Sequence, residues 1–197
     1  MLPRRLVEVA RLFARGLLMA MALTPALIAG IAKARPHKRC QNSKAAVGKI
    51  SSQATRDAVV CLINEQRAAH RLPPLHESPL LDRSAQGWTN SMVASGSFTH
   101  GADFGARISA AGFRWSSAGE NIATGYATPA AVVNAWMHSA PHCQNILNPT
   151  YASIGTGVLA RVVGSPHRGA TWTQDFALAA GHRAPSGNWG PANACPY

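Results

Sequence analysis

The sequence has few acidic residues: 8 Asp and Glu stand against 19 Lys and Arg, a formal net charge of +11. An excess of this size suggests a nucleic-acid partner, so its distribution matters. Residues 1–34 carry five of the basic residues, and five more lie between Arg35 and Lys49. The rest of the chain has nine basic residues against seven acidic ones. Because no aromatic residues interleave with the basic segment, DNA or RNA binding is not expected. The segment is interpreted as a solvated linker, or as a contact for anionic envelope polymers or lipid headgroups.

The sequence also lacks a membrane-spanning apolar run. The uncharged stretch at 16–32 is shorter than the roughly 20 residues that a span needs, and Pro25 interrupts it. Arginines precede this stretch, and Ala32-Lys33-Ala34 follows with the small residues that signal peptidase reads. Residues 1–34 are therefore predicted to be a signal peptide, with a retained anchor as the alternative. The mature protein is expected to be secreted, with no stable membrane span.

Cysteine is scarce, and the four cysteines form no C-x-x-C pair of the kind that holds zinc or performs redox chemistry. In an exported chain they are expected to form disulfides. Four cysteines allow three connectivities, and the sequence does not select one. The pairing favoured here is Cys40–Cys61, which would staple the basic segment to the first helix, with Cys143–Cys195, which would anchor the Gly/Pro-rich tail.

No Gly-x-Ser-x-Gly elbow of a serine hydrolase occurs. A nucleophile would have to be Ser139, polarised by His142 or His100 and oriented by a third residue. Nothing in the spacing argues for that geometry, and the cysteines are expected to be paired. No catalytic residue is therefore assigned.

Apolar spacing predicts helices in the first half of the chain. One runs over 55–70 with Thr55 as its N-cap. A second begins with Ser78 as its N-cap, ends at Gly96, and should bury Trp88 and Met92.

Further helices are predicted over 104–111 and from Thr128-Pro129 until Pro141. The β-branched, alternating residues at 153–163 and 170–178 predict an antiparallel hairpin. Helices followed by strands give an α+β fold class.

Four short motifs occur in order in the second half of the chain. They are Phe98-Thr99-His100, Gly119-Glu120-Asn121-Ile122-Ala123, the stretch from Trp136 to Pro149, and Trp172-Thr173-Gln174-Asp175-Phe176. The chain thereby resembles the CAP superfamily, the SCP-like extracellular domain of cysteine-rich secretory proteins, antigen 5 and pathogenesis-related proteins, in its bacterial secreted branch. The resemblance implies a three-layer α-β-α sandwich with a central antiparallel sheet. It divides the chain into the signal peptide, a basic linker at 35–53, the CAP domain at 54–181 and an irregular tail at 182–197.

The resemblance also implies a cavity lined by His100, Glu120 and His142. Two imidazoles and a carboxylate suit a divalent metal such as zinc, although no cofactor is required. Where many eukaryotic members carry a second glutamate, this chain has Ser139, with His138 beside it. All five residues are candidate cavity residues.

The chain is therefore expected to act outside the cell as a monomer that binds an unknown ligand or envelope component. Two alternatives remain open: a metal-dependent hydrolase or protease using the same cavity, and a lipid or sterol carrier. A hydrolase would need a general base in addition to its metal ligands, and no second cavity carboxylate is evident. A binding module is thus favoured over an enzyme.

Overall fold

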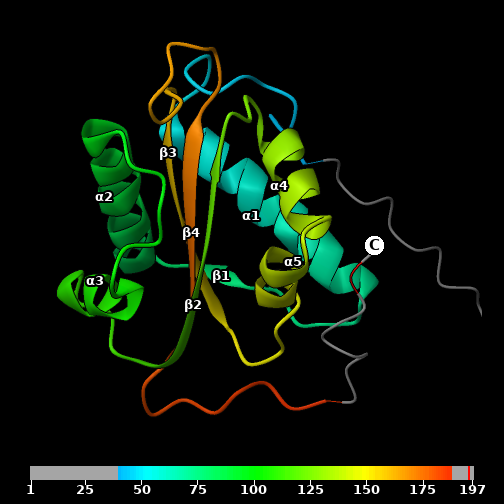
Figure 1. Ribbon diagram of the computed structural model, residues 1–197. Coiled ribbons are helices and arrows are strands. Elements are labelled where there is room, and N and C mark those ends of the chain that lie inside the picture. The colour runs from blue at the N-terminus through cyan, green and yellow to red at the C-terminus, as the bar shows by residue number, and fades with distance from the viewer. Residues whose placement is uncertain (1–39, 188–194, 196–197) are drawn as a thin grey trace, which may run out of the picture. The chain divides into compact units, whose positions relative to one another are not determined.

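Four strands form the middle layer of the described part of the protein, and helices cover both faces (Figure 1). The computed structural model describes residues 40–187 and Cys195. The strand order is β1 (His76–Glu77), β3 (Ser153–Leu159), β4 (Thr171–Ala179) and β2 (Trp115–Thr124). Helices α1 (Ser52–Ala69), α4 (Pro129–Met137) and α5 (Ala140–Ile146) lie on one face, and α2 (Pro79–Ser95) and α3 (Phe104–Ala110) lie on the other. The predicted α+β class and three-layer sandwich are confirmed.

The sheet is antiparallel apart from the two-residue strand β1, which pairs in parallel with β3. The sequence pattern predicts only the β3–β4 hairpin. It extends β3 to residue 163, whereas the strand ends at Leu159 and the chain then forms a loop. The pattern misses β2, because Gly119, Glu120 and Asn121 interrupt the apolar alternation in the middle of that strand.

Most of the expected helix boundaries are correct. Helix α2 begins at Pro79, directly after Ser78, and ends at Gly96, whose φ of 67° is the left-handed conformation that glycine favours. The expected N-cap of α1 is wrong: Ser51, not Thr55, accepts the backbone N–H of Ala54. Helix α1 thus starts inside the segment predicted to be linker, and residues 40–51 belong to the described structure.

Pro141 does not end a helix, as predicted, but lies in the first turn of α5. Helix α4 already stops at Met137, and His138 is its C-cap. Proline fits the first turn of a helix because its missing N–H would have no intrahelical partner there. His142 therefore lies on a helix and not in a loop.

The main core lies between the sheet and the α1, α4 and α5 layer. Trp136 of α4 is buried in one cluster with Trp172 and Phe176 of β4. Tyr151 stacks on Phe176 with ring centroids 5.6 Å apart. Large aromatic side chains of this kind contribute much of the apolar area that a domain of this size buries.

Helix α2 packs very closely on the opposite face of the sheet. A methyl group at Gly155 or Gly157 of β3 would overlap the α2 backbone, so glycine is required there by the close approach. Met92 is buried as predicted, but Trp88 is only half-buried and packs at the edge of this layer. The prediction of Trp88 as a core residue is therefore wrong.

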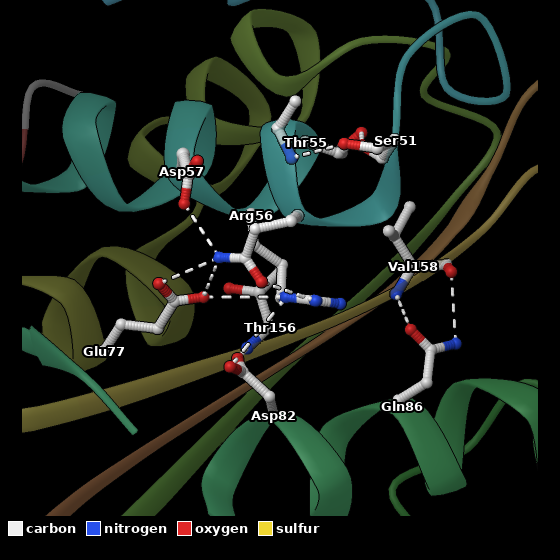
Figure 2. Close-up of polar contacts among 11 residues, drawn as sticks. Ser51, Thr55, Arg56, Asp57, Glu77, Asp82, Gln86, Thr156 and Val158 are labelled. Carbon is white, nitrogen blue, oxygen red and sulfur yellow. Dashed lines mark hydrogen bonds and ion pairs between the residues drawn. The ribbon is translucent and has the colours of Figure 1, made fainter. Parts of the chain in front are cut away.

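Side chains of α2 close the edge of the sheet that β1 leaves open (Figure 2). Asp82 Oδ1 accepts the backbone N–H of Thr156 at 2.8 Å, while Gln86 both accepts from and donates to the backbone of Val158. Burial raises the pKa of Asp82 to about 6. These contacts satisfy backbone groups of β3 that would otherwise offer a free edge to another strand.

Both favoured disulfides are present, linking Cys40 to Cys61 and Cys143 to Cys195. No cysteine in the described residues is free. The helices in that part of the chain include none with the length and apolar character that crossing a membrane requires. The predicted signal peptide lies outside the described residues.

Candidate functional site

Glu120 lies in the middle of β2, with its side chain only 1% exposed. Its Oε1 is 2.8 Å from His100 Nδ1, and its Oε2 is 2.6 Å from Arg107 Nη2. His100 and Glu120, both expected in one cavity, are therefore in direct contact through a hydrogen bond. Both carboxylate oxygens are engaged by cationic or ring nitrogen donors, so this carboxylate anchors the residues around it.

Trp88 and Arg107 hold the segment that carries His100. The Arg107 guanidinium lies over the Trp88 ring, 3.9 Å from its centroid. The Trp88 indole donates to the backbone carbonyl of Thr99 at 2.9 Å, one residue before His100. Helices α2 and α3 and strand β2 therefore fix the imidazole together.

Asp175 is the cross-strand neighbour of Glu120, and it was not among the site residues predicted from the sequence. It is buried, and its Oδ1 has no hydrogen-bond partner within the described residues. Burial, with the nearby Glu120 charge adding to it, raises the pKa of Asp175 to about 8. The folded protein thus favours the protonated form of this carboxyl. An acidic residue within an otherwise buried strand is the sequence feature that indicates a site residue here.

His142 projects from the first turns of α5 and is held by Ser139 through a 2.8 Å contact between Nδ1 and Oγ. Burial lowers the pKa of His142, and the nearby charge of His100 lowers it further. The imidazole is therefore neutral at pH 7. In the tautomer whose Nδ1–H donates to Ser139 Oγ, Nε2 presents a lone pair for a ligand.

His142 and Ser139 line a pocket of about 270 Å³ beside the β2 edge. Phe98, 47% exposed, and Tyr126, 38% exposed, line the same pocket. The remaining lining residues are Ile122, Ala123, Thr124, Ala135 and Trp136. The pocket is apolar with one polar corner, which is the usual composition of a small-molecule site.

The other predicted cavity residues lie elsewhere. His100 and Glu120 are not among the residues that line this pocket. His138 is exposed, and its Nδ1 contacts the carbonyl of Asn134. Of the five predicted residues, the structure thus brings Ser139 and His142 into the pocket and pairs His100 with Glu120.

The three candidate metal ligands do not form a compact cluster. In residues 40–187 and Cys195, a group of three potential ligands within 4.8 Å of one another occurs at Cys40, Cys61 and Glu65, where the sulfurs form a disulfide. His100 and His142 nevertheless each have Nδ1 held by an oxygen, leaving Nε2 for a ligand. Metal-binding histidines are commonly oriented in this way. The two imidazole nitrogens are donors of the type that zinc prefers, although the described residues hold no three-ligand cluster outside the disulfide.

Side chains also close the outer edge of β2. Three carbonyls of that strand each accept a hydrogen bond, from a hydroxyl, an amide and an indole. The donor and acceptor pairs are Tyr151 to Ala118, Asn145 to Glu120 and Trp136 to Ile122. The motif residues Trp136 and Asn145 are therefore structural in part, because they lock the strand that carries Glu120 against α4 and α5.

Comparison with known proteins gives the family. Residues 60–176 match the model of the cysteine-rich secretory protein family, CAP, which is more than half of the chain. The chain belongs to the CAP family. A CAP relative is the uncharacterized protein YkwD of Bacillus subtilis (strain 168), which is 37% identical over 131 residues. The match covers 64% of this chain and 48% of YkwD, so the chain spans about half the length of that relative.

Solved structures show the same CAP fold. An extracellular protein from Bacillus anthracis that contains an SCP domain matches with a TM-score of 0.56 and 24% identity, over 65% of this chain and 44% of that one. An outer surface protein of Borrelia burgdorferi matches with a TM-score of 0.59 and 21% identity, over 66% of this chain and 96% of its own.

Proposed function

We propose that this CAP protein is exported and binds a small ligand in the pocket beside His142. The observation that carries the proposal is that two exposed aromatic side chains, Phe98 and Tyr126, line the same hollow as the neutral imidazole of His142. Exposed aromatic rings beside a polar group are typical of binding sites. The expected ligand has an apolar part for the rings and a donor group or a metal ion for His142 Nε2.

Export is supported by the two disulfides, because such bonds persist mainly outside the cytosol. It is also supported by the descriptions of two structural neighbours as extracellular and outer surface proteins. The signal peptide at 1–34 and the domain limits 54–181 stay part of the proposal.

Divalent metal binding is part of the same proposal. His100 and His142 would hold a zinc ion through Nε2, and Glu120 would orient His100 without binding the ion. When bound, zinc would supply a Lewis acid with open positions for a ligand. Ser139 holds the His142 ring, whose pKa is lowered by burial and by the nearby charge of His100, and Glu120 holds the His100 ring through Nδ1.

A binding module is favoured over a hydrolase because a hydrolase needs a free base. Both oxygens of Glu120 are engaged by His100 and Arg107, and the described residues place no carboxylate in the pocket lining. The apolar lining also supports the lipid-carrier alternative, in which the pocket of about 270 Å³ would hold part of a lipid's acyl chain.

The test is calorimetric titration of zinc into the wild type, His142→Ala and His100→Ala at pH 7.5 and pH 5.5. His138→Ala is the matched control, since that histidine is exposed and outside the pocket. Binding should be lost in the His142 and His100 variants, kept in the control, and weakened at pH 5.5, where protons compete for the rings. Binding that survives both of the first two substitutions would overturn the metal site.

Ligand binding is tested separately, by fluorescence titration of a short-chain fatty acid into the wild type, Tyr126→Ala and Trp115→Ala. Tyr126 lines the pocket, whereas Trp115 is a similarly exposed aromatic outside it. Saturable binding that only Tyr126→Ala weakens would support the lipid-carrier alternative. Hydrolytic turnover lost with a chelator would instead replace the binding-module proposal by the hydrolase.

A further inference from the structure

One end of the sheet carries basic residues from two separate segments. The β3–β4 loop at 160–170 contributes Arg161, His167 and Arg168, and the N-terminal segment at 40–51 contributes Lys44 and Lys49. All five side chains are exposed. We call these five residues the basic end.

The two segments lie at the same end of the domain (Figure 1). A methyl group at Gly48, next to Lys49, would sit 3.3 Å from the Ala160 side chain. The carbonyl of Ser43, next to Lys44, accepts the N–H of Ala130 at 2.8 Å. The lysines are thus carried by backbone that is packed onto the domain.

The loop is also held in place. Thr171 donates its hydroxyl to the carbonyl of Arg161 at 2.7 Å, and Thr124 accepts the N–H of Val163 at 3.2 Å. A β-bridge joins Val162 and Ser165 within the loop. The backbone around Arg161 is therefore ordered before a ligand binds, which reduces the entropy lost on binding.

Arg161, His167 and Arg168 line a hollow of about 480 Å³ together with Ser165 and Val93 of α2. Neither segment contains an acidic residue, and no ion pair in the described part of the chain uses a cation of the basic end. The positive charge there is consequently uncompensated by neighbours.

We propose that the basic end binds an extended polyanion bearing phosphate groups. Guanidinium groups match phosphate oxygens with paired hydrogen bonds, and the hollow gives two of them a shared concave site. Exposed ion pairs are individually weak, so affinity has to come from several contacts to one multiply charged chain. Lys44 and Lys49 supply the additional contacts along that chain.

The geometry favours a soluble polymer over a lipid bilayer. Surfaces that bind bilayers combine cations with large apolar side chains that enter the lipid. The exposed large apolar residues of the described chain are Phe98, Trp115 and Tyr126, and none lies in the two basic segments.

The test uses the mature protein and long-chain inorganic polyphosphate, with binding followed by fluorescence anisotropy across a salt series. The double variant Arg161→Ala/Arg168→Ala should bind roughly three- to thirtyfold more weakly, from two exposed charged contacts. Its slope of log affinity against log salt should fall by about 1.5, from counterion release.

The matched control is Arg114→Ala/Arg183→Ala, which removes two exposed arginines. These flank the other end of β4, where Ala180 bonds to Arg114. This control variant should bind polyphosphate nearly as tightly as the wild type does. All variants should have the melting temperature and the zinc titration curve of the wild type. Equal losses in both double variants, or no binding of polyphosphate, would overturn the proposal. Binding of phosphatidylglycerol vesicles without binding of polyphosphate would replace the polymer by a membrane.

Discussion

Asn145 donates its side-chain amide to the backbone carbonyl of Glu120 across 3.1 Å, and to Asn121 Oδ1 across 2.9 Å. One residue of α5 therefore holds both the backbone of the strand that carries the central carboxylate and the amide next to it. Asn121 in turn donates to Gln174 of β4, so this network crosses from the helix layer into the sheet.

The first prediction concerns this contact. Asn145→Ala should lower the free energy of unfolding by about 1–3 kcal/mol, because the substitution leaves buried acceptors without a donor. Asn134→Ala, at an exposed position of α4, should change it by less than about 0.5 kcal/mol. Urea denaturation of the three proteins measures both values, and equal midpoints would show that solvent replaces the Asn145 amide.

Arg67 gives a second prediction, because it is a fully buried charge in α1. Its guanidinium donates to the carbonyls of Pro73, Ile146 and Asn148, and burial lowers its pKa to about 10. Arg67→Lys should cost at least about 3 kcal/mol, since one ammonium cannot reach carbonyls on two sides and each charged hydrogen bond contributes about 1.5–3 kcal/mol. Arg71→Lys, at an exposed position, is the control in thermal melts.

Asp175 gives a prediction about pH. Its pKa rises from 3.8 to about 8 on folding, so the protonated form is favoured in the folded protein. This contribution to stability is complete below about pH 4 and is lost as the pH rises through about 8. Asp175→Asn, which cannot ionise, should gain stability relative to wild type between pH 5 and pH 8.5. Denaturation midpoints at both values measure the gain. Asp57→Asn, at a position outside the core, should not follow this trend.

The mature protein should begin at Arg35 and contain no free thiol. The predicted cleavage site Ala32-Lys33-Ala34 motivates the first part, and the pairing of all four cysteines supports the second. Intact mass and thiol titration of secreted material check both. A retained N-terminus, or two reactive thiols, would contradict export processing or pairing respectively.

The parts of the fold that could be predicted depend on local signals. Pro79 and Gly96 mark the ends of α2 as expected, because a first-turn proline and a left-handed glycine act on the backbone at their own positions. Pro141 was ambiguous for the same reason: a proline marks a helix boundary, but the residue itself does not say whether one helix ends there or another begins.

The site was harder to predict because its polar residues are buried in the sheet. Glu120 and Asp175 face each other across β2 and β4, a relationship fixed only by strand register. Trp88 follows a core-like helical spacing, yet it lies at the edge of its layer, where Arg107 covers its ring. The apolar spacing of a helix predicts neither the register of two strands nor whether a residue lies at the edge of its layer.

Helix α5 sets the alignment of the pocket by its residue count. His142 and Asn145 are three residues apart and thus share one side of the helix. There, His142 lines the pocket and Asn145 donates a hydrogen bond to β2. Each residue of an α-helix advances the direction of its side chain by about 100°. One residue inserted between the two would rotate the imidazole about a quarter turn away from the pocket, while Asn145 kept its hydrogen bond to β2. The direction in which His142 points therefore depends on the number of residues in this turn as well as on the identity of its side chains.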